Sequence, residues 1–198
     1  MELVVASKNI HKIREFRSML KEYKQFDVLS LLDFPSYQPP EEEGSSFEEI
    51  ASNKALHAAK ALNCLTLADD SGLIVPALQG APGIYSSRYA GDLATDAENR
   101  HKLLKEMQHI TEPQRQGYFE CWIAIASPEG IKKCVKGLCE GMILGSEKGN
   151  YGFGYDSIFI KHEYGKSFAE IEESLKNRIS HRRKAFDKLH VFLSSLGN

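Results

Sequence analysis

The sequence predicts an α/β fold in which helices flank a mixed, twisted β-sheet. In the first half of the chain, short apolar runs alternate with segments whose apolar residues recur at helical spacing. In the second half, two long β-prone runs, 118–126 and 131–144, enclose the turn Pro128-Glu129-Gly130, which is typical of an antiparallel hairpin. Alternating strands and helices followed by a hairpin indicate a mixed sheet.

The elements of the first half follow from periodicity and from start signals. Strands are expected at 3–6, 27–32 and 64–68, and helices at 10–22 and 45–62. Ser45 and Ser46 each precede a glutamate by three residues, which marks the start of the second helix. Asp69-Asp70-Ser71-Gly72 follows the third strand, and its residue types predict a sharp turn before a further strand at 73–75.

The second half contains a helix from Thr95 to Met107, which opens with the capping pattern Thr95 and Glu98. A glycine-rich and aromatic loop at 149–156 follows the hairpin. The last helix runs from Ser180 to Leu196 with apolar residues on one face.

The length of 198 residues predicts one domain over residues 1–198, built as two lobes. We expect the active-site cleft to lie between these lobes. A formal net charge of -2 argues against broad nucleic-acid binding. No apolar run approaches the roughly 20 residues of a membrane span, so we expect no membrane partner. The chain begins with a strand instead of a signal peptide, so we expect a cytoplasmic protein.

The acids Asp69 and Asp70 are the first candidate site. Adjacent carboxylates at the end of a buried strand repel each other unless a proton, a hydrogen bond or a cation such as Mg²⁺ offsets the repulsion. The run Glu41-Glu42-Glu43 precedes a helix of the same sheet, so one of its acids can share that ion. The alternative is a solvated turn and a solvated acidic face, which are the usual roles of such residues.

Three further segments indicate a nucleotide. The turn Ser7-Lys8-Asn9 leads into a helix N-terminus, where backbone N–H groups can hold a phosphate. Lys12 opposes the dipole of that helix unless an anion lies in front of it. In 149–156, glycines permit close approach and an aromatic ring can stack on a base, although aromatic residues more often fill the core. The segment 176–183 is basic at a helix N-terminus.

Six motifs in order make the sequence resemble the inosine triphosphate pyrophosphatase family over essentially the whole chain. The motifs are Ser7-Lys8-Asn9-Ile10-His11-Lys12, Glu42-Glu43-Gly44-Ser45-Ser46-Phe47 with Lys54-Ala55, Ala68-Asp69-Asp70-Ser71-Gly72-Leu73, Gly80-Ala81-Pro82-Gly83-Ile84-Tyr85-Ser86, Phe153-Gly154-Tyr155-Asp156 and Ser180-His181-Arg182. The resemblance implies a hydrolase that removes non-standard purine nucleotides (ITP, dITP and XTP) from the nucleotide pool. It would cleave the α–β phosphoanhydride to release the monophosphate and pyrophosphate, as a Mg²⁺-dependent homodimer in which Mn²⁺ is a candidate substitute.

The resemblance also implies residue roles. Glu42 and Asp70 would bind Mg²⁺, and Asp70 would be the general base. The expected substrate-binding residues are Ser7, Lys8, Asn9, Ile10, His11, Lys12, Lys54 and Ser71 toward the phosphates, and Phe153, Gly154, Tyr155, Asp156, Lys176, His181 and Arg182 toward the base. Phe153 would stack on the purine, and Lys176, His181 and Arg182 would read its edge. A site that donates to a 6-oxo group leaves donors unpaired against a 6-amino group.

Three positions depart from the family pattern, and one role stays open. Lys8 stands where glycine is usual, Glu43 where threonine is common, and Arg183 where glycine is usual. Asp69 either supports Asp70 or is a further metal ligand through water. The alternatives to a purine pyrophosphatase are a hydrolase of pyrimidine or standard nucleotides on a similar scaffold, and a nucleotide-binding protein without catalysis.

Overall fold

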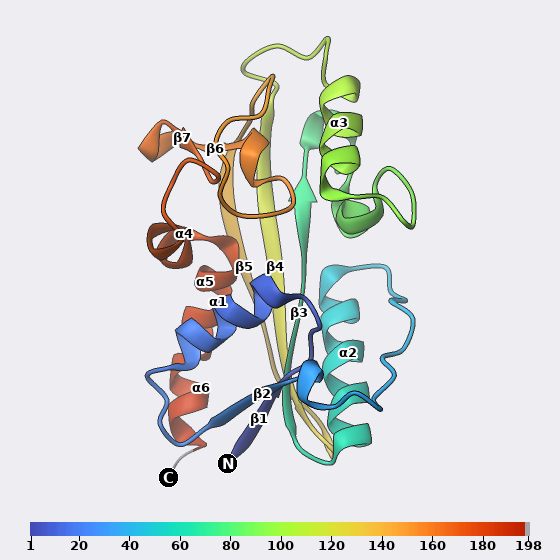
Figure 1. The fold of residues 1–198 in the computed structure, drawn as a ribbon, viewed down its shortest axis with the longest axis vertical. Helices are drawn as coiled ribbons and strands as arrows, with labels where there is room; N and C mark the ends of the chain where they lie inside the picture. Colours follow the sequence, from blue (N-terminus) through green and yellow to red (C-terminus); the bar gives the residue numbers. More distant parts are fainter. Residues whose placement is uncertain (197–198) are drawn as a thin grey trace. The chain divides into compact units, whose positions relative to one another are not determined.

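The structure is a computed structural model that describes residues 1–196, and its contacts divide the chain into two compact units. Unit 1 comprises Met1–Asp70, Cys121–Gly137 and the chain from Arg182 on, and unit 2 comprises Ser71–Glu120 and Leu138–His181. A seven-stranded sheet has the strand order β2-β1-β3-β4-β5-β6-β7 (Figure 1). The mixed α/β fold is therefore confirmed, whereas the single domain and its cleft stay predictions.

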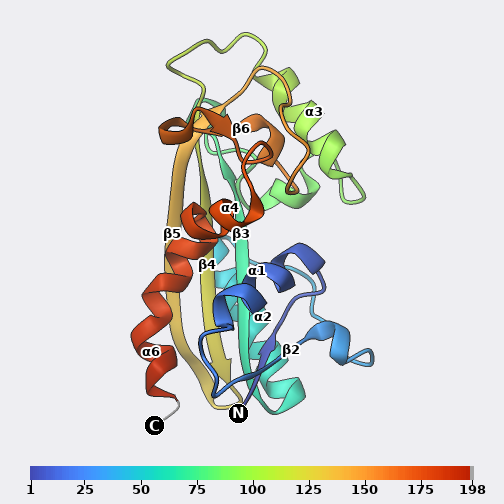
Figure 2. The same ribbon diagram turned by 60° about the vertical axis from the view of Figure 1, so that its left-hand side comes forward.

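Unit 1 begins with β1, which pairs in parallel with both of its neighbours in the sheet, β2 and β3. Its elements are β1 (Glu2–Val5), α1 (Ile10–Leu20), β2 (Asp27–Ser30), a 3₁₀ turn at Leu31–Asp33, α2 (Phe47–Leu62), the first part of β3 (Leu65–Ile74), parts of β4 (Gln116–Ser127) and β5 (Gly130–Ile143), α5 (His181–Phe186), a 3₁₀ turn at Asp187–Leu189 and α6 (His190–Ser195). Within this unit, α2 covers one face of the strands, and α1 and α6 cover the other (Figures 1 and 2).

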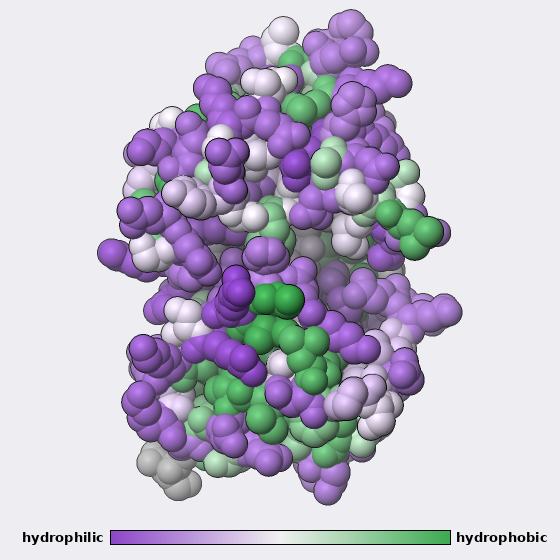
Figure 3. Space-filling model, in the orientation of Figure 1, coloured by the Kyte–Doolittle hydropathy of each residue, from purple (hydrophilic) through white to green (hydrophobic). Residues whose placement is uncertain are grey.

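The two cores of unit 1 follow from the alternation of side chains along its strands. Leu3 and Val5 pack with Phe16 of α1 and with the C-terminal helices. On the opposite face, alanines of α2 and of β3 pack against each other, which permits a close approach of the helix to the sheet. Some apolar surface remains exposed, and Figure 3 shows it gathered over the region where Figure 1 draws α1 and β2. Ile10, at the start of α1, and Leu32, in the 3₁₀ turn that follows β2, are among the exposed apolar residues of unit 1.

Unit 2 is built around the remaining parts of the three long strands. Its further elements are 3₁₀ turns at Pro76–Leu78, Gly83–Arg88, Asp156–Ile158 and His162–Tyr164, together with α3 (Asp96–Glu106), β6 (Phe159–Lys161), β7 (Lys166–Ser167) and α4 (Glu173–Ile179). β6 pairs in antiparallel fashion with both β5 and β7. Its core is aromatic, with ring centroids of Phe119 and Phe159 4.7 Å apart and those of Phe159 and Phe168 5.1 Å apart. Among residues 1–196, no helix is long and apolar enough to cross a membrane.

The predicted turn at residues 69–72 is wrong, because β3 runs without interruption from Leu65 to Ile74. Asp69 and Asp70 therefore lie in the middle of a strand, where successive side chains point to opposite faces. Each carboxylate meets its own cation, so the two acids need no turn to separate them. The helix starts are confirmed: the Ser46 hydroxyl accepts from the backbone N–H of Glu49, and Thr95 and Glu98 form a capping box.

Candidate functional site

Asp69 is the centre of a buried charge network in unit 1. Its Oδ2 lies 3.0 Å from Nζ of Lys12 and 2.9 Å from Nη2 of Arg182. The guanidinium of Arg182 also pairs with Glu15 of α1. Burial raises the pKa of Asp69, but Lys12 and Arg182 outweigh it and hold that pKa well below its usual range. Asp69 is thus an ionised partner of two cations. Its negative charge offsets the unfavourable interaction between Lys12 and the dipole of α1.

The predicted phosphate turn lies directly before α1. Asn9 is the N-cap: its Oδ1 accepts from the backbone N–H groups of His11 at 2.9 Å and Lys12 at 3.3 Å. The Ser7 hydroxyl oxygen accepts from the N–H of Asn9 at 3.1 Å. Lys8 and Ile10 are exposed beside them. The turn is therefore held by its own side chains, with Asn9 satisfying two of the N–H groups of the helix start.

Glu42 and Asp70 meet on one ammonium group. Nζ of Lys54, from α2, lies 2.6 Å from Oε1 of Glu42 and 2.9 Å from Oδ1 of Asp70. Burial raises the pKa of Asp70, and Lys54 offsets only part of that rise. Burial lowers the pKa of Lys54, but the two carboxylates outweigh it and raise that pKa. Glu42 of the acidic run and Asp70 of β3, which are 28 positions apart in the sequence, thus bind the same ammonium group in unit 1.

This pair of carboxylates fits a magnesium ion. Mg²⁺ is usually held by one or two carboxylates together with substrate phosphates and water, so a full cage of protein ligands is not needed. Among the described residues, no group of three or more His, Cys, Asp or Glu side chains is arranged to hold a metal, so a magnesium ion at this point would need further ligands from substrate or water. The two acids already converge on a cation, Lys54, which shows that their oxygens can serve one positive charge. Asp69 is turned away from this point, toward its own cations.

The aromatic and glycine loop forms a second group, in unit 2. Oδ2 of the buried Asp156 accepts from the backbone N–H of Phe153 at 2.8 Å and from Nζ of Lys176 at 2.6 Å. That ammonium also lies 4.4 Å from the centroid of the Phe153 ring. A Cβ on Gly152 would overlap the Asp156 carboxylate, and its φ of +78° favours glycine. The loop therefore wraps closely around a buried ion pair.

The other predicted base-reading residues are divided between the two units. Tyr155 is buried in unit 2 and donates its hydroxyl to the carbonyl of Ser86 at 2.8 Å. His181 is buried in unit 2 with its ring stacked on Phe119, at a centroid distance of 4.7 Å and an interplanar angle of 14°. Arg182 belongs to unit 1 and contacts carboxylates there, so its predicted role toward the base stays a prediction. Ser71 lies on β3 at the first position of unit 2.

Several residues of these groups were not singled out by the sequence. Glu15 lies among the apolar residues of α1, and an acid on a buried helix face is a signal of a buried partner. Asp96 and Arg100 lie one turn apart on α3, which by itself indicates only a solvated helix pair. In the structure both contact Gly154 of the loop, and Arg100 also contacts Glu147.

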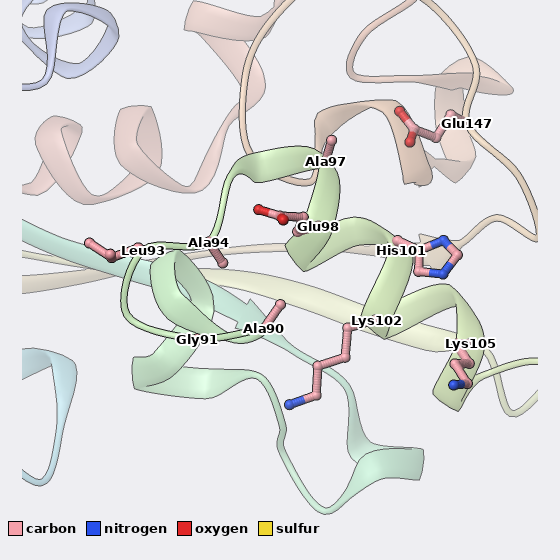
Figure 4. A pocket seen from close by; sticks show the side chains of 10 residues that line it. All are labelled: Ala90, Gly91, Leu93, Ala94, Ala97, Glu98, His101, Lys102, Lys105 and Glu147. Atoms are coloured by element: carbon pink, nitrogen blue, oxygen red, sulfur yellow. The ribbon is translucent and has the colours of Figure 1, made fainter.

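A cavity of about 880 Å³ lies beside this part of unit 2. Its lining residues are Ala90, Gly91, Leu93, Ala94, Ala97, Glu98, His101, Lys102, Lys105 and Glu147. Figure 4 shows that Glu98, His101 and both lysines come from α3, whereas Glu147 comes from a separate segment. Charges of both signs line the cavity, and none of the residues predicted for the substrate belongs to its lining.

Comparisons with known proteins place these features in a family. The sequence model of the Ham1 family matches residues 3–192. The chain is 58% identical to the dITP/XTP pyrophosphatase of Protochlamydia amoebophila over 197 residues, which cover 99% of each chain. The structure resembles the Ham1 protein of Staphylococcus aureus (TM-score 0.87, 41% identity, 99% of this chain and 100% of the other). It also resembles a HAM1 protein from Coxiella burnetii (TM-score 0.90, 38% identity, 98% and 99%).

Proposed function

The chain belongs to the Ham1 family, and on this premise we propose that it hydrolyses non-standard purine nucleoside triphosphates. Its substrates would be ITP, dITP and XTP, and the products would be the monophosphate and pyrophosphate. The name of the relative from Protochlamydia amoebophila, dITP/XTP pyrophosphatase, supports this class of substrate. The chain would thereby remove these nucleotides from the nucleotide pool.

One observation carries the proposal: Glu42 and Asp70 converge on the ammonium of Lys54. Two carboxylates and a lysine at one point are the residues needed to bind a metal–triphosphate complex, since the acids attract the metal and the lysine attracts phosphate. When bound, Mg²⁺ would neutralise charge on the phosphates and help to position the attacking water.

The remaining chemistry belongs to side chains of this chain. Asp70 would accept a proton from the water that attacks the α–β phosphoanhydride. Its burial raises its pKa, and a carboxylate with a raised pKa is a stronger base. The ammonium group of Lys54 would pair with phosphate oxygens of the substrate in place of the two carboxylates. Asp69 would keep Lys12 in place beside the turn that precedes α1.

The group in unit 2 has the properties that a purine base requires. Phe153 offers an aromatic ring, and Lys176 offers a hydrogen-bond donor held by Asp156. A cation beside an aromatic ring suits an electron-rich carbonyl such as the 6-oxo group of inosine or xanthosine. Such a donor would leave a 6-amino purine poorly paired, which favours rejection of adenine.

A product assay tests the substrate class. ITP, XTP, GTP, ATP and dUTP would each be incubated with Mg²⁺, and pyrophosphate would be measured separately from orthophosphate. We expect pyrophosphate mainly from ITP and XTP, and we expect a chelator of divalent cations to stop its release. Release of orthophosphate, or a preference for dUTP, would assign the chain to a different phosphohydrolase reaction. Binding without turnover of any nucleotide would leave a nucleotide-binding protein.

Two matched pairs of variants test the site. Asp70→Asn removes the proposed base and should lower kcat by about 10²-fold or more, whereas Asp92→Asn, on an exposed loop, should not. Glu42→Gln should raise the Mg²⁺ concentration needed for half-maximal rate, whereas Glu41→Gln, its exposed neighbour, should leave it unchanged. Unchanged turnover in Asp70→Asn would refute the assigned role.

We also propose that the protein is a cytoplasmic homodimer. Light scattering would test the dimer by its mass.

A further inference from the structure

We propose that Asp96 and Arg100 of α3 are positioning residues that hold the peptide groups beside Phe153 and so present its ring to the purine. The proposal rests on the proposed function, because it concerns the loop that would receive the base. Neither residue belongs to one of the six motifs that carry the resemblance to the family, and neither would touch the substrate itself. Both would act through Gly154, the residue that follows Phe153 in the chain.

The two side chains hold both backbone polar groups of Gly154. Oδ2 of Asp96 accepts from the N–H of Gly154 at 2.7 Å. Nη1 of Arg100 donates to the carbonyl oxygen of Gly154 at 2.8 Å. Residues four apart on a helix lie on the same face, so one turn of α3 presents an acceptor and a donor to one residue. Gly154 has a φ of +61°, in the left-handed region, and these two bonds define that conformation.

Arg100 is itself held in place. Its Nε donates to Oε2 of Glu147 at 2.9 Å, and the hydroxyl of Ser157 donates to the same oxygen at 2.8 Å. The planar guanidinium therefore uses one nitrogen for the carboxylate and another for the loop, which sets its orientation. Bonds that involve a charged group are stronger than neutral ones, so the hold on Gly154 is stronger than that of an ordinary turn.

The backbone on the other side of Phe153 is fixed as well. The N–H of Phe153 donates to Asp156 at 2.8 Å, and Asp156 is paired with Lys176. Phe153 thus has a hydrogen bond at its own nitrogen and two more on the following residue. These three bonds set the direction in which its side chain leaves the backbone. Because the ring is already in place, substrate binding does not have to order the loop, and its entropic cost is smaller. This effect should lower KM more than it changes kcat.

The alternative is that Asp96 and Arg100 only stabilise unit 2 by joining α3 to the loop. The two roles differ in how they combine with Phe153. A residue that acts through Phe153 has no further effect on substrate binding once that ring is gone, whereas a purely stabilising residue acts independently and its effects add.

The experiment is a double-mutant cycle with ITP as substrate. Arg100→Gln and Asp96→Ala should each raise KM about tenfold with kcat changed less than twofold. In a Phe153→Leu background, the same changes should raise KM by less than twofold. Lys105→Gln and Asp92→Ala are matched controls, since both residues are exposed, and they should leave KM unchanged in either background. Melting temperatures would identify any variant that fails to fold. Equal effects with and without Phe153 would overturn the proposal.

Amide hydrogen exchange provides a readout that needs no activity. In Arg100→Gln, the amides of Phe153 and Gly154 should exchange at least tenfold faster than in the wild type, and in Lys105→Gln they should not. Unchanged exchange in Arg100→Gln would overturn the proposal even if the enzyme is active. Absence of ITP and XTP hydrolysis by the wild type would instead refute the proposed function, and the exchange result would still decide whether α3 holds this loop.

Discussion

Replacing Arg182 by methionine should destabilise the protein more than any substitution on its surface. Arg182 is 1% exposed, and its guanidinium pairs with the carboxylates of Glu15 and Asp69 inside unit 1. Removing one member of a buried ion pair costs about 3–5 kcal/mol, because a charge stays buried without its partner. Asp69 keeps Lys12 at 3.0 Å, so we expect the lower end, about 3 kcal/mol.

The expected change in melting temperature follows from the length of the chain. An unfolding entropy of roughly 2 cal/mol/K per residue gives about 0.4 kcal/mol/K for 198 residues. A loss of about 3 kcal/mol then lowers Tm by about 7 °C. Circular dichroism during heating measures Tm, and urea unfolding measures the free energy. The two results should agree on the order of the variants.

The next residue of the helix provides a matched control. Nε of Arg183 lies 2.6 Å from Oδ1 of Asp187, but both side chains are partly exposed. Arg183→Met should therefore cost less than about 1 kcal/mol, as exposed ion pairs do. The double variant Glu15→Met/Arg182→Met should be more stable than Arg182→Met alone, because it also removes the buried carboxylate that Arg182→Met leaves without its partner. Equal costs for Arg182→Met and Arg183→Met, or strict additivity with Glu15→Met, would refute the reasoning.

Two further predictions concern unit 2. The guanidinium of Arg115 donates to four backbone carbonyls, which would lose this donor in Arg115→Met. We therefore expect this variant to lower the free energy of unfolding, measured in urea, by about 2 kcal/mol or more. A loss below about 0.5 kcal/mol would contradict this prediction. Gly152→Ala should lower Tm and raise KM for ITP together, because its Cβ would displace the Asp156 carboxylate and its φ is positive. Gly91→Ala also has a positive φ but meets no atom within 4 Å, so it should lower Tm alone.

The periodic parts of the chain could be predicted because their signals are local. Ser46 and Glu49 mark the start of α2 within four residues, and the apolar spacing of α1 identifies its buried face. The conflict at Lys12 was also visible, since a cation in a first helical turn opposes the dipole. What resolves that conflict, Asp69, lies 57 positions further along and could not be identified from spacing.

The turn at Asp69-Asp70 was predicted wrongly because long-range contacts override local preference. Aspartate, serine and glycine favour turns when they are solvated. Here Asp69 meets Arg182, 113 positions away, and Asp70 meets Lys54, 16 positions away on the other face of the strand. Asp96 and Arg100 were missed for the same reason, because their spacing indicates a helix-surface pair while their partner is more than 50 positions away.

The division of the chain into units limits how this protein can be truncated or recombined with its relatives. The chain passes from one unit to the other after Asp70, Glu120, Gly137 and His181, and the first three of these points lie inside β3, β4 and β5. Neither unit is a continuous stretch of polypeptide, so neither can be expressed, truncated or exchanged with a relative as a single segment.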